Sequence, residues 1–221
     1  LWGNTATGSG SQIYDDNNST SSVSYSLVQG GFSGTGNLST DPLFANAASG
    51  DLRLLPGSPA IDAGTNTGAP ATDIRGLSRP VNVVTDMGAY ESRGFALTKT
   101  GGDGQSATIN TLFTTSPLAV SVASNGASEP VNGGKITFTA PASGPSATLA
   151  PNPSTINCSG SPTVCSTSVN ATANATAGGP YNVAASAAGV AAANQATFGL
   201  TNNKAAATAV TLGNLDQTYT G

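Results

Sequence analysis

Turn-forming residues interrupt this sequence so often that little room is left for a long helix. The 221 residues include 28 glycines and 13 prolines, and Ser, Thr, Asn and Ala fill much of the space between them. Ser, Thr and Asn side chains compete with helical hydrogen bonds, and glycine adds a cost in backbone entropy. Short strands joined by tight turns are therefore expected, and the sequence predicts an all-β protein.

Charge is scarce, and its distribution argues against several classes of partner. Only 8% of residues are charged, the net charge is −4, and the seven Lys and Arg residues are scattered along the chain. Nucleic-acid binding needs a basic patch, so we do not expect it. The sequence also lacks an apolar run of the ~20 residues that a membrane-spanning helix requires, so we expect no membrane insertion.

The two cysteines suggest an oxidising environment. Cys158 and Cys165 are separated by SGSPTV, in which Gly160 and Pro162 favour a turn that brings them together. A disulfide across so short a loop contributes roughly 2 to 3 kcal/mol in the chain-entropy model and indicates an extracellular or cell-surface location. The alternative is a pair of free thiols. With no histidine in the sequence, a zinc site is not expected, and no cofactor is predicted.

Residues 38–91 resemble the C-terminal end of the right-handed parallel β-helices of large secreted bacterial surface proteins. The resemblance rests on DPLFANAASGDLRLLPGSPAIDAG, DIRGLSRP and DMGAYE. It implies that residues 1–93 form the last coils and the cap of such a β-helix. Apolar side chains would then point inward in ladders. Those expected to do so are Ile13, Val23, Tyr25, Leu27, Leu43, Phe44, Leu52, Leu54, Leu55, Ala60 and Ile61.

Carboxylates and arginines gather in the same segment. They are Asp62, Asp73, Arg75, Arg79, Asp86 and Glu91. The interpretation we favour is structural, with ion pairs and turn caps that fasten an irregular end and with the Asp62 carboxylate accepting backbone N–H bonds. The alternative is a catalytic site, because β-helix lyases and glycosidases use acidic residues and arginine. An oxygen-rich loop at Asp15, Asp16, Asn17 and Asn18 is either a solvated turn or, less in keeping with its spacing, a Ca²⁺ site.

Residues 94–202 show β-prone segments at intervals of roughly ten residues, the rhythm of a β-sandwich. Alternation in KITFTA places Ile136 and Phe138 on the core face, and Ala107, Ile109 and Leu112 are expected to share a face. GGPYNVAAS followed by ATFGLTN resembles the last two strands of bacterial immunoglobulin-like repeats. This resemblance implies an immunoglobulin-like sandwich in which the Tyr181 hydroxyl bonds back to the backbone. The alternative is that Tyr181 is an ordinary, half-buried strand residue.

The segment 203–221 reads as a linker and the first strand of a further β module. The alternative is a strand donated to a neighbouring subunit, with Val210, Leu212 and Leu215 entering its groove. Repeated head to tail, such a contact would build a filament.

Taken together, these features predict a non-enzymatic structural or adhesive segment of a secreted or cell-surface bacterial protein, used for display, as a stalk or as an adhesin. One alternative is a self-assembling extracellular filament subunit, and another is a carbohydrate-active β-helix fragment. The expected partners are further domains of the same parent chain, other copies of the chain, or a ligand on a host or cell surface.

Overall fold

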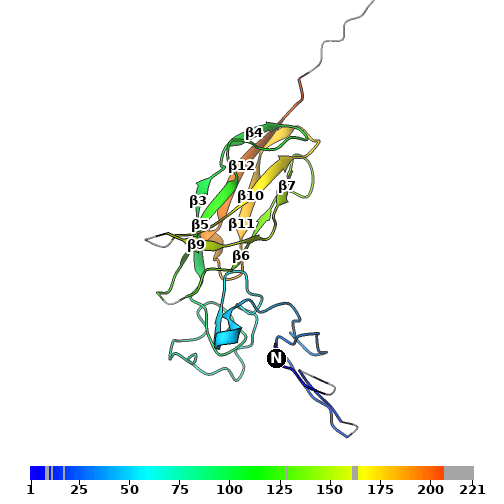
Figure 1. Cartoon of the computed structure of the whole chain (residues 1–221), viewed down its shortest axis with the longest axis vertical. Coiled ribbons are helices and arrows are strands. Elements are labelled where there is room, and N and C mark those ends of the chain that lie inside the picture. The colour runs from blue at the N-terminus through cyan, green and yellow to red at the C-terminus, as the bar shows by residue number, and fades with distance from the viewer. Residues whose placement is uncertain (8–9, 11, 17, 128, 161–163, 207–221) are drawn as a thin grey trace, which may run out of the picture.

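The computed structural model describes residues 1–7, 10, 12–16, 18–127, 129–160 and 164–206. Figure 1 shows an elongated molecule with a β-sandwich above a loop-rich region that contains the N-terminus. The protein is all-β, as predicted, and the two helical elements in these residues are single 3₁₀ turns. Among the described residues, no helix is long and apolar enough to cross a membrane.

Two five-stranded sheets form the sandwich. The first has the order β3–β5–β10–β7, with β9 also paired to β10, and the second has the order β4–β12–β11–β6–β8. All pairings in the two sheets are antiparallel except that of β4 with β12, which is parallel. The bounds are β3 Phe95–Gly101, β4 Gln105–Thr108, β5 Leu118–Ser124, β6 Lys135–Thr139, β7 Ala147–Ala150, β8 Ser154–Thr155, β9 Asn157–Ser159, β10 Val164–Ala173, β11 Gly178–Ser186 and β12 Ala196–Asn203, with the 3₁₀ turn η2 at Ala192–Asn194.

Alternating side chains of the two sheets form the apolar core between them. Ile136 and Phe138 are buried, as predicted, while Thr137 and Thr139 of the same strand are exposed. The ring of Phe138 lies 6.0 Å from that of Phe198 on β12, centre to centre, and both rings are almost wholly inaccessible to water. Burying such rings is the largest favourable contribution that a single side chain makes to a core of this kind.

One predicted core position lies a residue out of place. Ala107 is buried and Ile109 is half-buried, but Leu112 is 45% exposed and its neighbour Phe113 is only 4% exposed. The cause is a turn after β4, in which the Thr111 N–H donates to the Thr108 carbonyl and Asn110 has a φ of +61°. Alternation cannot be carried through such a turn, because the chain re-enters with its inward positions shifted.

The region before the sandwich contains little regular structure. Its strands are β1 (Phe44–Asn46) and β2 (Asp51–Leu54), which pair antiparallel around the 3₁₀ turn η1 (Ala47–Ser49). Upstream, Leu27 and Leu38 form an isolated parallel bridge. The described residues of this region show no stacked parallel sheets, so the predicted β-helix is not confirmed.

Three passes of the chain nevertheless lie side by side upstream of β1. The Leu1 ammonium group donates to the Leu27 carbonyl (2.7 Å), and the Gln29 N–H donates to the Leu1 carbonyl (3.0 Å). The pass that contains Leu38 lies beside that of Leu27, because the Val28 N–H donates to the Leu38 carbonyl (2.9 Å). Three chain segments are therefore joined laterally by backbone hydrogen bonds, although they are too short to form named strands.

Burial in this region follows the predictions only in part. Leu27, Leu54, Leu55, Ala60 and Ile61 are buried, as expected. Tyr25 and Leu52, however, are both 40% exposed, so the expectation that they point inward was wrong. Tyr25 has a φ of +48°, and its ring lies over Gly36. Leu52 lies at the turn end of a two-stranded hairpin, where it finds less cover than Leu54.

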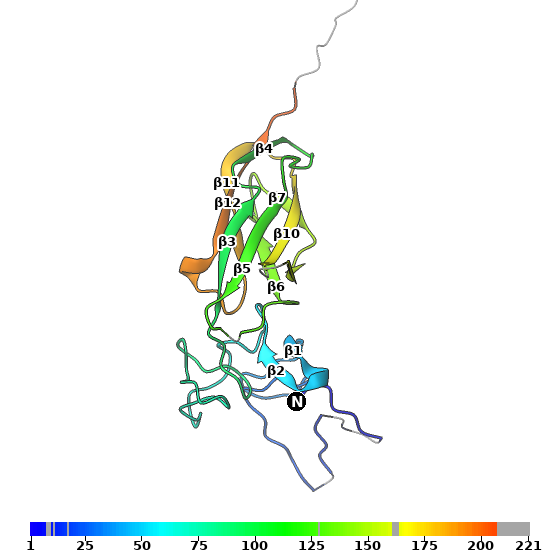
Figure 2. The same cartoon turned by 60° about the vertical axis from the view of Figure 1, so that its left-hand side comes forward.

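Apolar packing joins the two regions. Leu27, Leu54, Ala60, Ile61 and Met87 belong to the same buried cluster as the sandwich core. Backbone bonds cross at the same place: the Lys135 N–H donates to the Pro56 carbonyl (2.8 Å), and the Gly57 N–H donates to the Ala188 carbonyl (3.0 Å). Figure 2 shows the loops of the lower region meeting the lower end of the sandwich. We call this contact the junction.

Gly189 illustrates how closely the two regions approach at the junction. Its φ is +81°, and a Cβ atom there would lie 3.0 Å from both Ile61 Cδ1 and Phe95 Cδ2. Only glycine fits both the left-handed backbone and the space.

Candidate functional site

The charged residues singled out in the sequence meet beside the junction. Their segment, residues 62–91, is a series of turns and bends, so its backbone N–H groups need acceptors other than a strand ladder. The carboxylates supply them. We call Asp73, Arg75, Arg79, Asp86, Glu91 and Glu129 the junction cluster.

Asp73 and Arg75 form its first ion pair. Arg75 Nη2 lies 2.7 Å from Asp73 Oδ2, while Asp73 Oδ1 accepts the N–H groups of Arg75 (2.7 Å) and Leu77 (3.1 Å). Burial acts to raise the Asp73 pKa, but the Arg75 guanidinium and the backbone N–H donors outweigh it and lower that pKa to about 2. Asp73 is therefore held as a carboxylate that organises the turn around it.

Glu91 and Arg79 form a second, fully buried pair. Arg79 Nε lies 3.1 Å from Glu91 Oε2, and the side chains are 6% and 1% exposed. Both Glu91 oxygens also accept backbone bonds, Oε1 from the Val81 N–H (2.9 Å) and Oε2 from the Asp86 N–H (3.0 Å). Arg79 Nη2 donates to the Gly88 carbonyl (2.9 Å). A buried charge pair is tolerated where its remaining hydrogen-bonding positions are filled in this way.

Among the described residues, Asp86 is the carboxyl with the most strongly raised pKa. Burial raises the Asp86 pKa to about 7, and the carboxylates of Glu91 and Asp62 act in the same direction. The N–H groups of Ser92 (2.6 Å) and Asp62 (2.8 Å) donate to its two oxygens and offset part of the rise. Asp86 thus ties two turns together at the cost of placing a carboxyl where its charged form is disfavoured.

The Asp62 carboxylate does not have the predicted partners. It accepts the side-chain amide of Asn82 (2.9 Å) where backbone N–H bonds were expected. It is the backbone N–H of Asp62 that enters the cluster, as a donor to Asp86. The φ of +54° at Asp62 turns the N–H toward the cluster and the side chain toward Asn82.

Glu129 completes the cluster and was not found from the sequence. It is buried, comes from the loop between β5 and β6 of the sandwich, and lies 3.0 Å from Arg75 Nη1. The two residues are 54 positions apart, and no pattern in the sequence connects them. Arg75 also donates to the Glu91 carbonyl (2.6 Å) and lies over the Tyr90 ring, 5.3 Å from its centre. This arginine therefore bridges the two regions of the molecule.

The arrangement is suited to holding backbone in place. The carboxylate oxygens of Asp73, Asp86 and Glu91 each accept at least one bond from a neighbouring N–H group, mostly of the backbone. Within the described part of the chain, no buried side-chain nitrogen or oxygen lacks a hydrogen-bond partner. In the same residues no group of three or more His, Cys, Asp and Glu is placed to hold a metal ion.

The other predicted positions are spread over the molecule. Cys158 and Cys165 form a disulfide that joins the neighbouring strands β9 and β10, where they face each other directly. Asp16 accepts bonds from the Asn18 N–H and the Ser19 hydroxyl, as in a capped turn. Val210, Leu212 and Leu215, the predicted donated strand, lie outside the described residues.

The hydroxyl of Tyr181 takes a different route from the one predicted. It donates to Asn202 Oδ1 (2.9 Å), and the Asn202 amide in turn donates to the carbonyls of Ser146 (3.0 Å) and Thr176 (3.1 Å). The expected return to the backbone is therefore made through an asparagine. Burial raises the Tyr181 pKa to about 12, which the bond to Asn202 only partly offsets.

Comparison with known proteins identifies no relative: no family model matches the chain, nor does any curated protein or solved structure.

Proposed function

We propose that this chain is a non-enzymatic structural or adhesive segment of a secreted or cell-surface bacterial protein, in which an immunoglobulin-like sandwich is fixed to the terminal coils of a β-helix. The observation that carries the proposal is the junction cluster. Its carboxylates and guanidinium groups form hydrogen bonds with the backbone and ion pairs with one another. Arg75 also pairs with Glu129 of the sandwich. A site of this construction stiffens a joint.

The strand order supports the immunoglobulin-like assignment. One sheet has the order β3–β5–β10–β7, and the other holds the last two strands, β12 and β11, beside β6. This arrangement is similar to the ABED and GFC sheets of immunoglobulin domains. The chain passes from β3 in one sheet to β4 in the other, where β4 pairs in parallel with the last strand, β12. The disulfide is the departure, because it joins neighbours in one sheet and not the two sheets.

Support for terminal coils comes from the passes upstream of β1. Leu27 and Leu38 pair in parallel, and Leu1 joins Leu27 from another pass. Lateral backbone bonds between successive passes are the basis of a parallel β-helix. The disulfide favours an oxidising compartment, in keeping with an extracellular location.

A polymer is the second candidate, and one observation favours it. Figures 1 and 2 show Leu1 in the lower region and the end of β12 at the opposite pole of the sandwich. Contacts between opposite poles are head to tail, and they build a filament when the repeat does not close into a ring. Further domains of a parent chain attached at these poles would use the same geometry.

Size-exclusion chromatography with light scattering, followed by negative-stain microscopy, tests these proposals. We expect an elongated monomer for a stalk or display segment, whereas long polymers would favour the filament. A carbohydrate-active fragment predicts turnover of a polysaccharide that Asp86→Asn and Arg75→Ala abolish without loss of folding. Turnover of this kind by the folded wild-type chain would overturn the non-enzymatic proposal, while lowered thermal stability of both variants without turnover agrees with it.

A further inference from the structure

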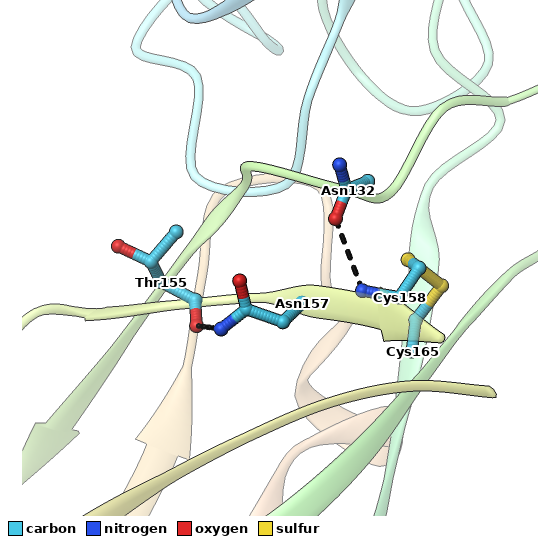
Figure 3. The surroundings of a disulfide bond; sticks show 5 residues. All are labelled: Asn132, Thr155, Asn157, Cys158 and Cys165. Carbon is cyan, nitrogen blue, oxygen red and sulfur yellow. Dashed lines mark hydrogen bonds between the residues drawn. A yellow bond between two sulfur atoms is a disulfide. The ribbon is translucent and has the colours of Figure 1, made fainter. Parts of the chain in front are cut away.

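The Cys158–Cys165 disulfide contacts the loop between β5 and β6, which contributes Glu129 to the junction cluster. Figure 3 shows the Cys158 N–H pointing at the side-chain oxygen of Asn132, to which it donates (3.0 Å). Asn132 belongs to residues 129–134, the part of the loop between β5 and β6 that also contains Glu129. Cys158 lies on β9, a strand of three residues.

Backbone bonds carry this contact further. The Gly133 N–H donates to the Ile156 carbonyl (2.9 Å), and the Ile156 N–H donates to the Gly134 carbonyl (2.8 Å). The next residue, Lys135, makes the crossing bond to Pro56. Ile156, the residue that precedes β9, and the 129–134 loop are thus joined by hydrogen bonds into one unit. That unit contacts the lower region at Pro56 and, through Glu129, at Arg75.

The cystine itself is reachable from solvent. Both cysteines are half-buried and line a groove of about 760 Å³, together with Val122, Asn132 and Glu129. A dithiol reductant of small size can therefore approach either sulfur from this side.

From these contacts we propose that the Cys158–Cys165 disulfide sets the stiffness of the junction and makes it sensitive to thiol reductants. A dithiol attacks one sulfur through its thiolate, the mixed disulfide is resolved by its second thiol, and two electrons and two protons pass to the cystine. The products are two cysteine thiols and the oxidised, cyclic disulfide of the reductant. Without the covalent link, β9 is held to β10 only by a short ladder of hydrogen bonds, and the Asn132 contact that fixes the 129–134 loop is weakened.

Amide hydrogen exchange on the full chain tests the proposal, with dithiothreitol as the reductant. The Lys135 amide reports the crossing bond to Pro56, and the Val183 amide, in the central strand β11, reports global unfolding. We expect reduction to accelerate exchange at Lys135 by about tenfold or more, well beyond the change at Val183. Equal acceleration at both amides, or none at Lys135, would overturn the proposal.

Two asparagine variants test whether reduction acts on the junction through the contact between Cys158 and Asn132, which we call the relay, or through a general loosening of the sandwich. Asn132→Ala in the oxidised protein should reproduce the acceleration at Lys135, and reduction of this variant should add little, because both changes remove the same restraint. Asn157→Ala is the matched control: Asn157 also lies on β9, but its side chain donates to Thr155, away from the loop. It should leave exchange at Lys135 unchanged. Additive effects of Asn132→Ala and reduction would contradict the relay, and the wild-type comparison remains decisive if a variant folds poorly.

Discussion

The two regions of this molecule are held together by different means. The sandwich buries large apolar side chains between paired sheets, with Phe138, Ile136, Phe198 and Leu200 almost wholly inaccessible. The region before it has a two-stranded hairpin and many turns, and much of its order comes from carboxylates that accept backbone N–H bonds. Irregular backbone can thus be fixed by a small number of buried charges, but such order depends on the ionisation of those groups.

The largest expected effect concerns the sandwich. Phe198→Ala removes a ring that packs beside Phe138, which lies on β6 of the same sheet, and large-to-small changes of this kind cost about 3 to 5 kcal/mol. We expect a lower midpoint of chemical denaturation, with the sandwich and the junction unfolding in one transition. Two separate transitions, followed by fluorescence of Trp2 and by circular dichroism, would show that the two regions are less coupled than their shared core indicates.

The second effect should be confined to the junction. Arg79→Met removes the guanidinium and leaves Glu91 buried without its cation, which costs about 3 kcal/mol. Limited proteolysis should then cut within residues 73–91 before the sandwich is attacked. Lys99→Met is the control, because Lys99 pairs with Asp103 at an exposed position. Pairs of that kind contribute at most about 1 kcal/mol. Equal sensitivity of the two variants would show that the junction cluster does not hold this region.

The pH dependence of stability sharpens the contrast. The folded-state pKa of Asp86 is raised to about 7, so the folded protein binds a proton more tightly than the unfolded chain, and stability should rise as pH falls from about 7 toward 4. The pKa of Asp73 is lowered to about 2, so its contribution is present above pH 4 and is lost as pH falls toward 2. Denaturation midpoints measured from pH 2 to 8 should therefore peak between about pH 4 and 5.

Asp86→Asn isolates the upper part of this profile. The variant should be less stable overall, because an amide cannot accept both N–H bonds with a nitrogen in one of the two positions. Its stability should no longer rise between pH 7 and 4. An unchanged slope in the variant would assign that rise to another group.

The smallest effect is expected at the polar end of the sandwich. Tyr181→Phe removes the hydroxyl that donates to Asn202 and should cost about 1 kcal/mol. Asn202 keeps its bonds to Ser146 and Thr176, so the fold should persist. Thermal denaturation of the variant beside the wild type measures the difference in stability. A loss of stability as large as that of Phe198→Ala would mean that this hydrogen-bond network is as important to the sandwich as its apolar core.

Sequence reasoning was most successful where local rules decide the outcome. Turn density predicted an all-β chain, alternation predicted that Ile136 and Phe138 face the core, and the short spacing of Cys158 and Cys165 predicted their bridge. The grouping of Asp73, Arg75, Arg79, Asp86 and Glu91 was also visible, since these residues are close along the chain.

Tertiary contacts explain what the sequence could not show. Glu129 meets Arg75 only because the β5–β6 loop faces the lower region, and Tyr181 meets Asn202 only because β11 and β12 pair. Phe113 is buried in place of Leu112 because of the backbone conformation of Asn110, which residue type alone does not determine. The β-helix remains a prediction, because the described residues do not show the parallel sheets, stacked from coil to coil, that define this fold.

The parallel pairing of β4 with β12 has a mechanical consequence. Leu200 to Asn203 lie beside Gln105 to Thr108 in the same direction, and β12 leaves the sandwich at the pole opposite Leu1 (Figure 1). Tension applied to the two poles would slide these strands along each other, so their hydrogen bonds would share the force and yield together, unlike those of a hairpin peeled open from one end.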